Sequence, residues 1–368
     1  MKVTTIGIDL AKSVFAVSCA DGRGKLVVRK QLRRAQVLEF VSRLKPCVVG
    51  MEACGGAHHW ARAMEQLGHE VRLMSPALVR PYRTGPKHDR NDADAICEAV
   101  RRPQMRYVAV KSVAQQDLLA LHRVRAQLVK QRIALSNQLR ALLHERGVVA
   151  RLGAAGLRAG LARALADEHD ERHEVSGAMR ELLLELSGWL REAEQRVAAI
   201  TKRIEHAAKH DERCARLMEV PGVGPLGASA LVATVGNARA FKRGRELSAY
   251  LGLTPRQHSS GGKTVMLGIS KHGDRYLRTL LIHGARSLLY RNRRRAHPRA
   301  PWLARLVARR GPNVAAVALA NHNARLLWAL LSRGDRYRPS PQPHSFPSRP
   351  STVVKRAREG KLLLDQGA

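Results

Sequence analysis

TTIGIDLAKSVFAVSCA, residues 4–20, holds the first two of three β-rich runs that decide the fold of the N-terminal third of the chain. The runs lie at 4–9, 14–19 and 25–30, and the turn-forming residues DGRG at 21–24 separate the last two. Short β-rich runs joined by tight turns are typical of antiparallel strands. The sequence therefore predicts three consecutive antiparallel strands at the start of the chain.

Helices and buried strands are predicted to alternate from there to about residue 100. A helical spacing of apolar residues at 37–44 precedes the apolar run CVVGM at 47–51, which suits a central strand. A helix at about 57–67, a strand at 70–74 and a helix that begins near Asp89 complete the pattern. The order β-β-β-α-β-α-β-α predicts an α/β domain with an RNase H-like fold.

Two long helices are predicted after this α/β domain. Leucines line one side of the pattern at 113–144, and residues 177–209 carry an apolar seam with alternating spacings of three and four. The Gly- and Ala-rich connection predicts an antiparallel hairpin or coiled coil, which packs on itself or on another subunit. Beyond it we expect a mostly helical domain and then a disordered tail rich in Pro and Ser. The predicted divisions are 1–110, 111–212, 213–335 and 336–368.

The charge balance indicates that the partner is a polyanion. The chain has 65 Lys and Arg against 30 Asp and Glu, a net charge of +35, and such a field attracts nucleic acid. Aromatic residues make up only 4% of the chain, and no amphipathic helix has the aromatic apolar face of a membrane-surface protein. Polar residues interrupt the apolar run at 314–331 and would be costly in a bilayer, so we expect no membrane span.

The cysteines and the N-terminal stretch predict a cytosolic protein. The five cysteines are odd in number, widely separated and never in a C-x-x-C pair, so neither a disulfide framework nor a zinc site is expected. Asp9 and Lys12 interrupt the stretch that would have to be the apolar core of a signal peptide.

Four carboxylates are candidates for a metal site. Asp9 and Glu52 end two strands that are adjacent in an RNase H-like sheet, and Asp89 and Asp92 share one face at the start of a helix. Acids this close repel one another unless divalent cations neutralise them, and oxygen ligands favour Mg²⁺ or Mn²⁺. Two such ions can stabilise the attacking and leaving oxygens of a phosphodiester. The alternative is that the last two acids only cap a helix.

Residues 7–13, GIDLAKS, are also similar to the phosphate loop of actin-like ATPases and sugar kinases. Ala11 stands where that loop depends on glycine, and no second Asp-Gly phosphate loop follows later in the chain. We therefore disfavour a nucleotide-phosphate site.

Further motifs, with Asp9 and Glu52, form an ordered set over residues 4–334. They are KHDRNDA at 87–93, NQLRALL at 137–143, VPGVGP at 220–225, YLGLTP at 250–255 and SSGGK at 259–263. This set resembles the DEDD transposases of bacterial insertion sequences. That family pairs a RuvC-like N-terminal domain with a C-terminal transposase domain carrying a nucleophilic serine, and some members are guided by an RNA from their own element.

The resemblance implies site residues and partners. The four carboxylates named above would form an acidic tetrad with Mg²⁺ or Mn²⁺, and Ser260 would attack a DNA phosphodiester to give a covalent phosphoserine intermediate. Ser259 is the competing assignment, and a Ser-Ser-Gly-Gly run is by itself typical of a turn. The implied partners are DNA, an element-encoded guide RNA and further copies of the chain in a dimer or tetramer.

Basic and glycine-rich segments supply candidate nucleic-acid contacts. The helix at 113–144 has no acidic residue between Asp117 and Glu145, and the turn at 221–225 can present backbone N–H groups to a phosphate, as helix-hairpin-helix elements do. Close helix packing explains the same glycines equally well. We expect salt-dependent contacts from Arg123, Arg125, Arg132, Arg140, Gly222, Gly224, Lys263, Arg275, Arg278, Arg293 and Arg294.

The sequence as a whole predicts a transposase or site-specific recombinase that cuts and rejoins DNA. One alternative is a RuvC-type, metal-dependent junction endonuclease in which Ser260 is passive. Another is a non-catalytic RNA-binding protein whose acids are structural. A trapped protein–DNA adduct separates the first two, because hydrolysis by water leaves none.

Overall fold

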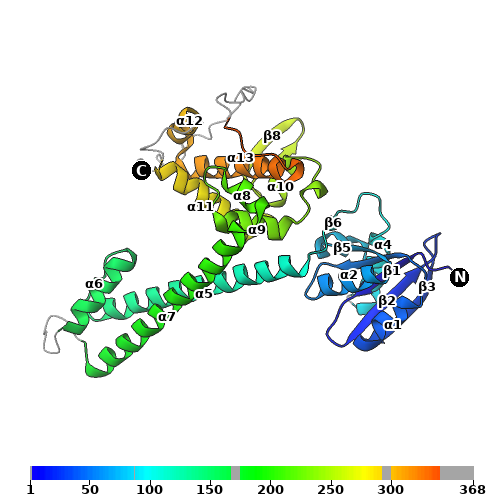
Figure 1. Ribbon diagram of the computed structural model, residues 1–368, viewed down its shortest axis with the longest axis horizontal. Coiled ribbons are helices and arrows are strands. Elements are labelled where there is room, and N and C mark those ends of the chain that lie inside the picture. The colour runs from blue at the N-terminus through cyan, green and yellow to red at the C-terminus, as the bar shows by residue number, and fades with distance from the viewer. Residues whose placement is uncertain (1, 87, 167–174, 292–299, 340–368) are drawn as a thin grey trace, which may run out of the picture.

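The computed structural model describes residues 2–86, 88–166, 175–291 and 300–339. Figure 1 shows an α/β body at the N-terminal end, a long helical hairpin and a second, mostly helical body. Each part has its own apolar core, and the α/β body has one on either side of its sheet. The mixed α/β architecture agrees with the predicted fold class, while the residue boundaries of the domains stay a prediction.

A six-stranded mixed sheet forms the N-terminal body, with strand order β3-β2-β1-β4-β5-β6. Strands β1, β2 and β3 are the predicted antiparallel meander, and β1, β4 and β5 are parallel. The edge strand β6 pairs antiparallel with β5 and was not predicted. The strands are β1 (Thr5–Asp9), β2 (Val14–Ala20), β3 (Leu26–Arg33), β4 (Val48–Glu52), β5 (Glu70–Met74) and β6 (Tyr107–Val108). This arrangement is the one expected of an RNase H-like domain.

Helices cover both faces of the sheet. After the short η1 (Arg34–Gln36), helices α1 (Val37–Ser42) and α2 (Ala57–Gln66) share one apolar cluster with the strands. The other cluster lies under α3 (Pro76–Val79), η2 (Arg80–Tyr82) and α4 (Asp89–Ala99). Burial on both faces explains why the central strands are almost uniformly apolar.

Helix α4 lies in direct contact with the backbone of two central strands. Gly7 of β1 is paired with Gly50 of β4. A Cβ at Gly7 would lie 2.4 Å from the carbonyl oxygen of Ala93, and one at Gly50 would lie 2.8 Å from Cβ of Val100. Glycine within a strand is typical of such close approach. The paired glycines therefore fix the depth at which α4 rests on the sheet.

Contacts along α4 also fix its direction. Cys97 Sγ lies 4.0 Å from the carbonyl oxygen of Thr5 at the start of β1. Nearer the start of the helix, Asp94 accepts a hydrogen bond from Ser18, which is paired with Gly7 further along that strand. The helix therefore runs opposite to β1, and its first turn lies toward the carboxyl end of the strand.

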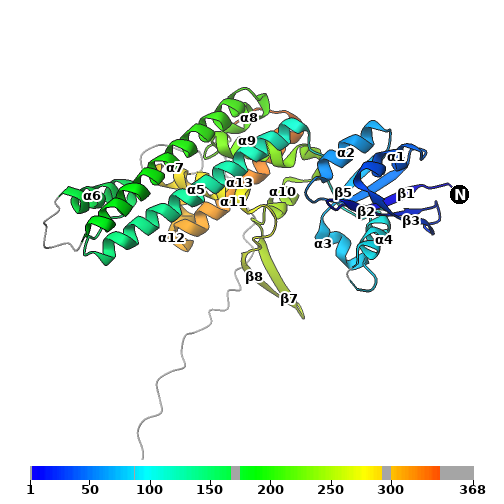
Figure 2. The same cartoon turned by 90° about the horizontal axis from the view of Figure 1, so that it is seen from below.

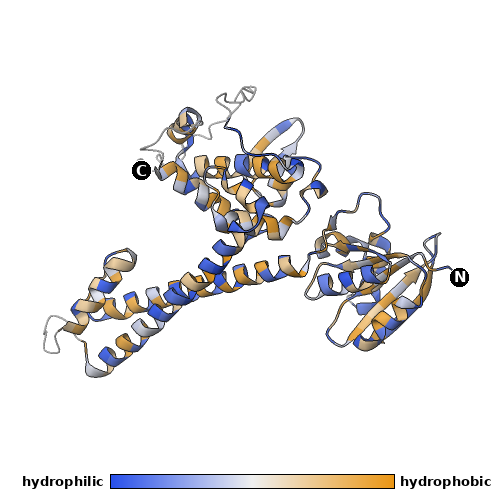
Figure 3. Ribbon diagram, viewed as in Figure 1, coloured by the Kyte–Doolittle hydropathy of each residue, from blue (hydrophilic) through white to orange (hydrophobic). Residues whose placement is uncertain are grey.

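The long helices α5 (Val113–Glu145) and α7 (Gly177–Lys209) run side by side within one chain (Figures 1 and 2). Hydrophobic and hydrophilic residues alternate along both helices in Figure 3, as expected of helices with one apolar face. The predicted seam is buried from Leu183 to Ile204 except at Ile200, which is half-buried, and its last buried position is Ala208 rather than Ala207. The Gly- and Ala-rich connection contains a helix, α6 (Gly153–Ala166), that packs on the same core.

The C-terminal body is mostly helical, as predicted, but it also carries a two-stranded ribbon, β7 (Pro255–Ser260) and β8 (Lys263–Ile269). The sequence predicted only a turn there, because the β7 stretch PRQHSS has no apolar alternation. The helices are α8 (Glu212–Met218), α9 (Pro225–Val235), η3 (Ala238–Ala240), α10 (Gly244–Tyr250), α11 (Arg275–Arg291), α12 (Ala300–Arg310) and α13 (Pro312–Arg333).

Helix α13 is the one helix among the described residues that is long and apolar enough to cross a membrane. It packs as a core helix of the C-terminal body, with Leu319 and Leu327 at most 1% exposed. Asn323 Nδ2 donates a hydrogen bond to the carbonyl oxygen of Pro221 at 3.0 Å. The polar residues that interrupt its sequence thus serve the fold of this body.

The described chain still contacts the C-terminal body just after the predicted boundary at 335/336. Tyr337 packs against the C-terminal core, and its backbone N–H donates to the carboxylate of Glu219 at 3.0 Å. The predicted tail at 336–368 stays a prediction, because residues 340–368 lie outside the described part of the chain.

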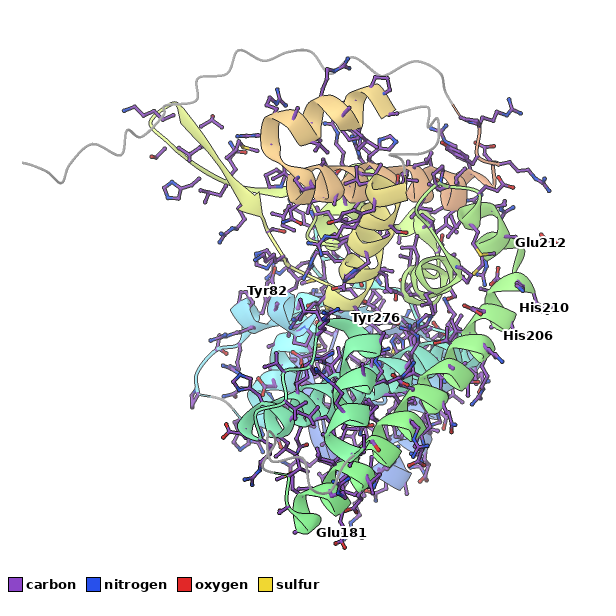
Figure 4. All side chains as sticks on the ribbon, turned by 90° about the vertical axis from the view of Figure 1, so that its left-hand side faces the viewer. Tyr82, Glu181, His206, His210, Glu212 and Tyr276 are labelled. Carbon is purple, nitrogen blue, oxygen red and sulfur yellow. The ribbon has the colours of Figure 1, made fainter. Side chains whose placement is uncertain are left out.

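A buried histidine joins the hairpin to the C-terminal body. His122 of α5 is 1% exposed, and its ring nitrogens lie 3.0 Å from Tyr276 Oη and 3.1 Å from Ser229 Oγ. Figure 4 labels Tyr276 at this junction. Burial lowers the pKa of His122 to about 4, so the ring is neutral at pH 7 and can both donate and accept a hydrogen bond.

We expect Gly7→Ala to destabilise the N-terminal body by about 1–3 kcal/mol, because the added methyl group meets backbone that cannot rotate away. Hydrogen exchange measured by mass spectrometry should show lost protection in the peptides of β1 and α4. Gly22→Ala is the matched control, since its Cβ would meet only Thr4 Cγ2 at 3.9 Å. Equal protection in the two variants would contradict the close-contact explanation.

Candidate active site

Asp9 and Glu52 stand side by side at one edge of the sheet. Ile8 of β1 is paired with Met51 of the parallel strand β4, and each acid is the next and last residue of its strand. Both side chains are half-buried. Burial, followed by the negative charges of Glu52 and Asp9, raises the pKa of the nearby Cys54 thiol. The predicted adjacency of the two strands is confirmed, and it brings two carboxylates together.

Asp89 and Asp92 lie in the first turn of α4, which begins where the sequence predicted. The helix cap is His88, whose Nδ1 accepts a hydrogen bond from the backbone N–H of Arg90. Asp92 is ion-paired with Arg83, whose Nη1 lies 3.3 Å from its Oδ1, whereas Asp89 is exposed. The two acids are at the expected end of the sheet, but one of them is held by an arginine.

These residues fit a metal site only in part. Asp9 and Glu52 offer neighbouring hard oxygen donors of the kind that Mg²⁺ prefers. In the part of the chain that the structure describes, no group of three or more His, Cys, Asp or Glu residues could hold a metal ion. The predicted convergence of four acids in one pocket is therefore not found in this arrangement, in which Asp92 is ion-paired with Arg83.

A fifth acid in this region is structural. Asp94 of α4 accepts hydrogen bonds from Ser18 Oγ at 2.5 Å and from Arg29 Nε at 3.1 Å. It therefore ties α4 to β2 and β3. Because these partners hold both of its carboxylate oxygens, Asp94 has a structural role and is not a candidate metal ligand.

Ser260 lies at the tip of the exposed β7–β8 ribbon. Gly261 and Gly262 form its two-residue turn, with φ values of +54° and +78°, as a type I′ turn requires. This turn pairs Ser260 with Lys263. Ser259, the competing residue, accepts a hydrogen bond from Gln257 Nε2 at 2.8 Å. The ribbon is exposed throughout, from Pro255 to Gly268.

The ribbon projects from the C-terminal body, and its tip lies apart from the sheet in both Figure 1 and Figure 2. Within one chain the serine and the acids therefore do not form one site. The hypothesis that a serine of the far domain reaches the acids needs a second copy of the chain or a rearrangement.

Arg278 has a structural role in the C-terminal body, and its burial does not favour the predicted contact with phosphate, which stays a prediction. Its side chain is buried and only 8% exposed, and Nη1 donates to the carbonyl oxygens of Leu251 at 2.9 Å and His272 at 2.8 Å. These two carbonyls flank the ribbon at its base. Sequence reasoning missed this role because a buried arginine is indistinguishable from an exposed one in a basic run.

Two of the predicted arginines on α5 are also engaged within the chain. Arg125 Nε donates to Thr201 Oγ1 at 2.8 Å, and Arg140 Nη2 donates to the carbonyl oxygen of Gly153 at 2.6 Å. Arg123 is exposed and Arg132 is half-buried. Lys263 and Arg275 are exposed as expected, whereas Arg293 and Arg294 lie outside the described residues.

The two glycines of the turn before α9 differ in their surroundings. Gly222 is closely packed, whereas Gly224 is open to solvent. Gly222 has φ +86°, and a Cβ on Gly284 of α11 would lie 1.9 Å from its carbonyl oxygen. Gly224 is exposed at the N-cap of α9, with nothing near the position of its missing Cβ. A phosphate contact at this turn stays a prediction.

Comparisons with known proteins give the same family over both bodies. A family model for IS110-type DEDD transposases, described as a transposase, matches residues 6–146, and a model of the transposase IS116/IS110/IS902 family matches residues 214–300. A probable family 20 transposase of Pseudomonas aeruginosa is 51% identical over 92% of this chain and 100% of its own length. The transposase for insertion sequence element IS1111A of Coxiella burnetii is 44% identical over 91% and 92%.

Removing Arg83 should make Asp92 easier to reach for a cation. We expect Arg83→Gln to lower the Mn²⁺ concentration at half-saturation about two- to five-fold, because a partly exposed ion pair contributes about 0.2–1 kcal/mol. Titration of free Mn²⁺ by electron paramagnetic resonance, without DNA, measures this. Arg80→Gln, at an exposed position of η2, is the control, and identical curves for both variants would show that Arg83 does not compete.

Proposed function

The chain belongs to the IS116/IS110/IS902 family of transposases, and we propose that it recombines the DNA of an insertion sequence by covalent catalysis at Ser260. The protein is a DNA transposase, and DNA is its substrate. The observation that carries the serine assignment is the exposed hairpin tip, where a two-glycine turn presents Ser260.

Two features favour Ser260 over Ser259 as the nucleophile. Ser260 is the last residue before the turn and lies at the extreme end of β7, where a DNA backbone has access. Ser259 lies one residue further back, on the other face of the ribbon, and already accepts a hydrogen bond from Gln257. A serine hydroxyl still needs a partner that takes its proton and a charge that stabilises the phosphate oxygens.

The proposal includes an acidic tetrad of Asp9, Glu52, Asp89 and Asp92 that holds Mg²⁺ or Mn²⁺. Members of the DEDD transposase family generally use divalent metal ions. The pair at the strand ends and the placement of the α4 first turn at the same end of the sheet support this assignment. A bound ion would stabilise negative charge on the reacting phosphate. Assembly of all four ligands requires that Asp92 leave Arg83.

We further propose that an RuvC-like domain at 1–110, a helical hairpin at 111–212 and a transposase domain at 213–335 work in a cytosolic dimer or tetramer. The separation of the ribbon tip from the sheet within one chain supports a site shared between copies. The basic face of α5 and the helix-hairpin-helix-like turn at 221–225 are the proposed contacts for DNA and an element-encoded guide RNA.

The decisive test is a trapped protein–DNA adduct. The wild-type protein, purified with its nucleic acid, should form a covalent complex on labelled DNA spanning an element end, visible after denaturing electrophoresis. Ser260→Ala should abolish the adduct, while Ser259→Ala should keep it. Cleavage without any adduct in the wild type would instead support the RuvC-type endonuclease, because attack by water leaves the protein unattached.

The guide-RNA proposal predicts that a defined RNA from the flank of the element co-purifies with the protein. The double variant Arg123→Gln/Arg132→Gln should retain less of it, with a shallower salt dependence, because fewer phosphates are neutralised. Sequencing the bound RNA identifies it and compares how much each protein retains. Filter binding at several salt concentrations measures the salt dependence. Retained function after loss of all four carboxylates would favour the alternative of a non-catalytic RNA-binding protein whose acids are structural.

A further inference from the structure

We infer that His258 and Lys263 form one catalytic face with Ser260 on the β7–β8 ribbon, with His258 taking the hydroxyl proton and Lys263 binding the reacting phosphate. This inference rests on the proposed role of Ser260. It adds two residues of the same ribbon, which supply the proton acceptor and the charge that a serine nucleophile needs.

The register of the ribbon places these side chains together. Ser260 is directly opposite Lys263, and His258 is directly opposite Val265. Opposite residues of an antiparallel pair share a face, and so do residues two apart on one strand. His258, Ser260 and Lys263 therefore lie on one face, whereas Ser259 lies on the other face, opposite Thr264.

Lys263 is suited to hold a phosphate beside the serine. Directly opposite residues have Cβ atoms about 4.5–5.5 Å apart, so the ammonium group can reach an oxygen of a phosphate that contacts Ser260 Oγ. Residues 255–269 contain no Asp or Glu, so no carboxylate of the ribbon neutralises this charge. Lys263 is also exposed, which leaves room for a DNA strand.

His258 is suited to accept the proton. A neutral imidazole is a general base near neutral pH, and the side chain is exposed on the same face as the hydroxyl. In the step, a bond forms between Ser260 Oγ and phosphorus while the bond from phosphorus to the leaving sugar oxygen breaks. The hydroxyl proton passes to His258, and the leaving oxygen takes a proton from water.

Close packing and hydrogen bonds at the base of the ribbon define the direction in which this face points. Gly252 and Gly273 have positive φ values, and a Cβ on Gly252 would lie 2.2 Å from the carbonyl oxygen of His272. Arg278 donates to that same carbonyl and to the carbonyl of Leu251. An isolated two-stranded ribbon is marginally stable in water, so this clamp and the two-glycine turn together maintain the register.

The test measures the rate of adduct formation and the affinity for the same DNA in the full-length protein. Lys263→Met should slow the adduct by about 10²-fold or more, as loss of a charge-stabilising donor does, with affinity changed less than about three-fold for one phosphate contact. Lys263→Arg should recover most of the rate, because it restores the charge. Thr264→Met is the matched control, being the neighbouring residue on the opposite face.

His258→Gln should slow the adduct by about 10²- to 10⁴-fold, with the affinity for the same DNA changed much less. If the wild type forms no adduct, the proposed serine function itself fails. If the wild type forms the adduct and Lys263→Met and His258→Gln match Thr264→Met, only the shared catalytic face is overturned.

Discussion

The contact of α4 with the backbone of β1 and β4 is the constraint on which the N-terminal site depends. Because Gly7 and Gly50 are paired across the two strands, the helix can rest on them without any intervening side chain. The same glycines precede by two residues the acids that end the strands. The depth and direction of α4 thus decide how near its first turn comes to Asp9 and Glu52.

In the C-terminal body, glycine and arginine residues have a different effect. They hold Ser260 at the tip of a ribbon that projects from this body. At the base of the ribbon, Gly252, Gly273 and Arg278 close the backbone tightly. At its tip, the two glycines of the turn leave Ser260 exposed. The proposed nucleophile gains access to a DNA backbone in this way, while the closely packed base keeps the direction of the ribbon defined.

The positive charge of the chain serves two purposes that composition does not distinguish. Arg278 and Arg140 hydrogen-bond to carbonyl groups, and Arg83 neutralises a carboxylate. Arg123, Lys263 and Arg275 remain exposed, where they can attract phosphates. Structural use of arginine means that the number of basic residues overstates the surface offered to nucleic acid.

The sequence by itself determined the elements and the neighbours that follow from local pattern. Apolar alternation and turn residues predicted the strand meander, the start of α4 at Asp89 and the long seam of α7, and parallel strand ends predicted that Asp9 adjoins Glu52. These features depend on residues close in the chain. Only the tertiary structure decided the pairing of Arg83 with Asp92, the burial of Arg278, and the separation of the ribbon tip from the acids. Such outcomes depend on packing between distant segments, which leaves no periodic signal in the sequence.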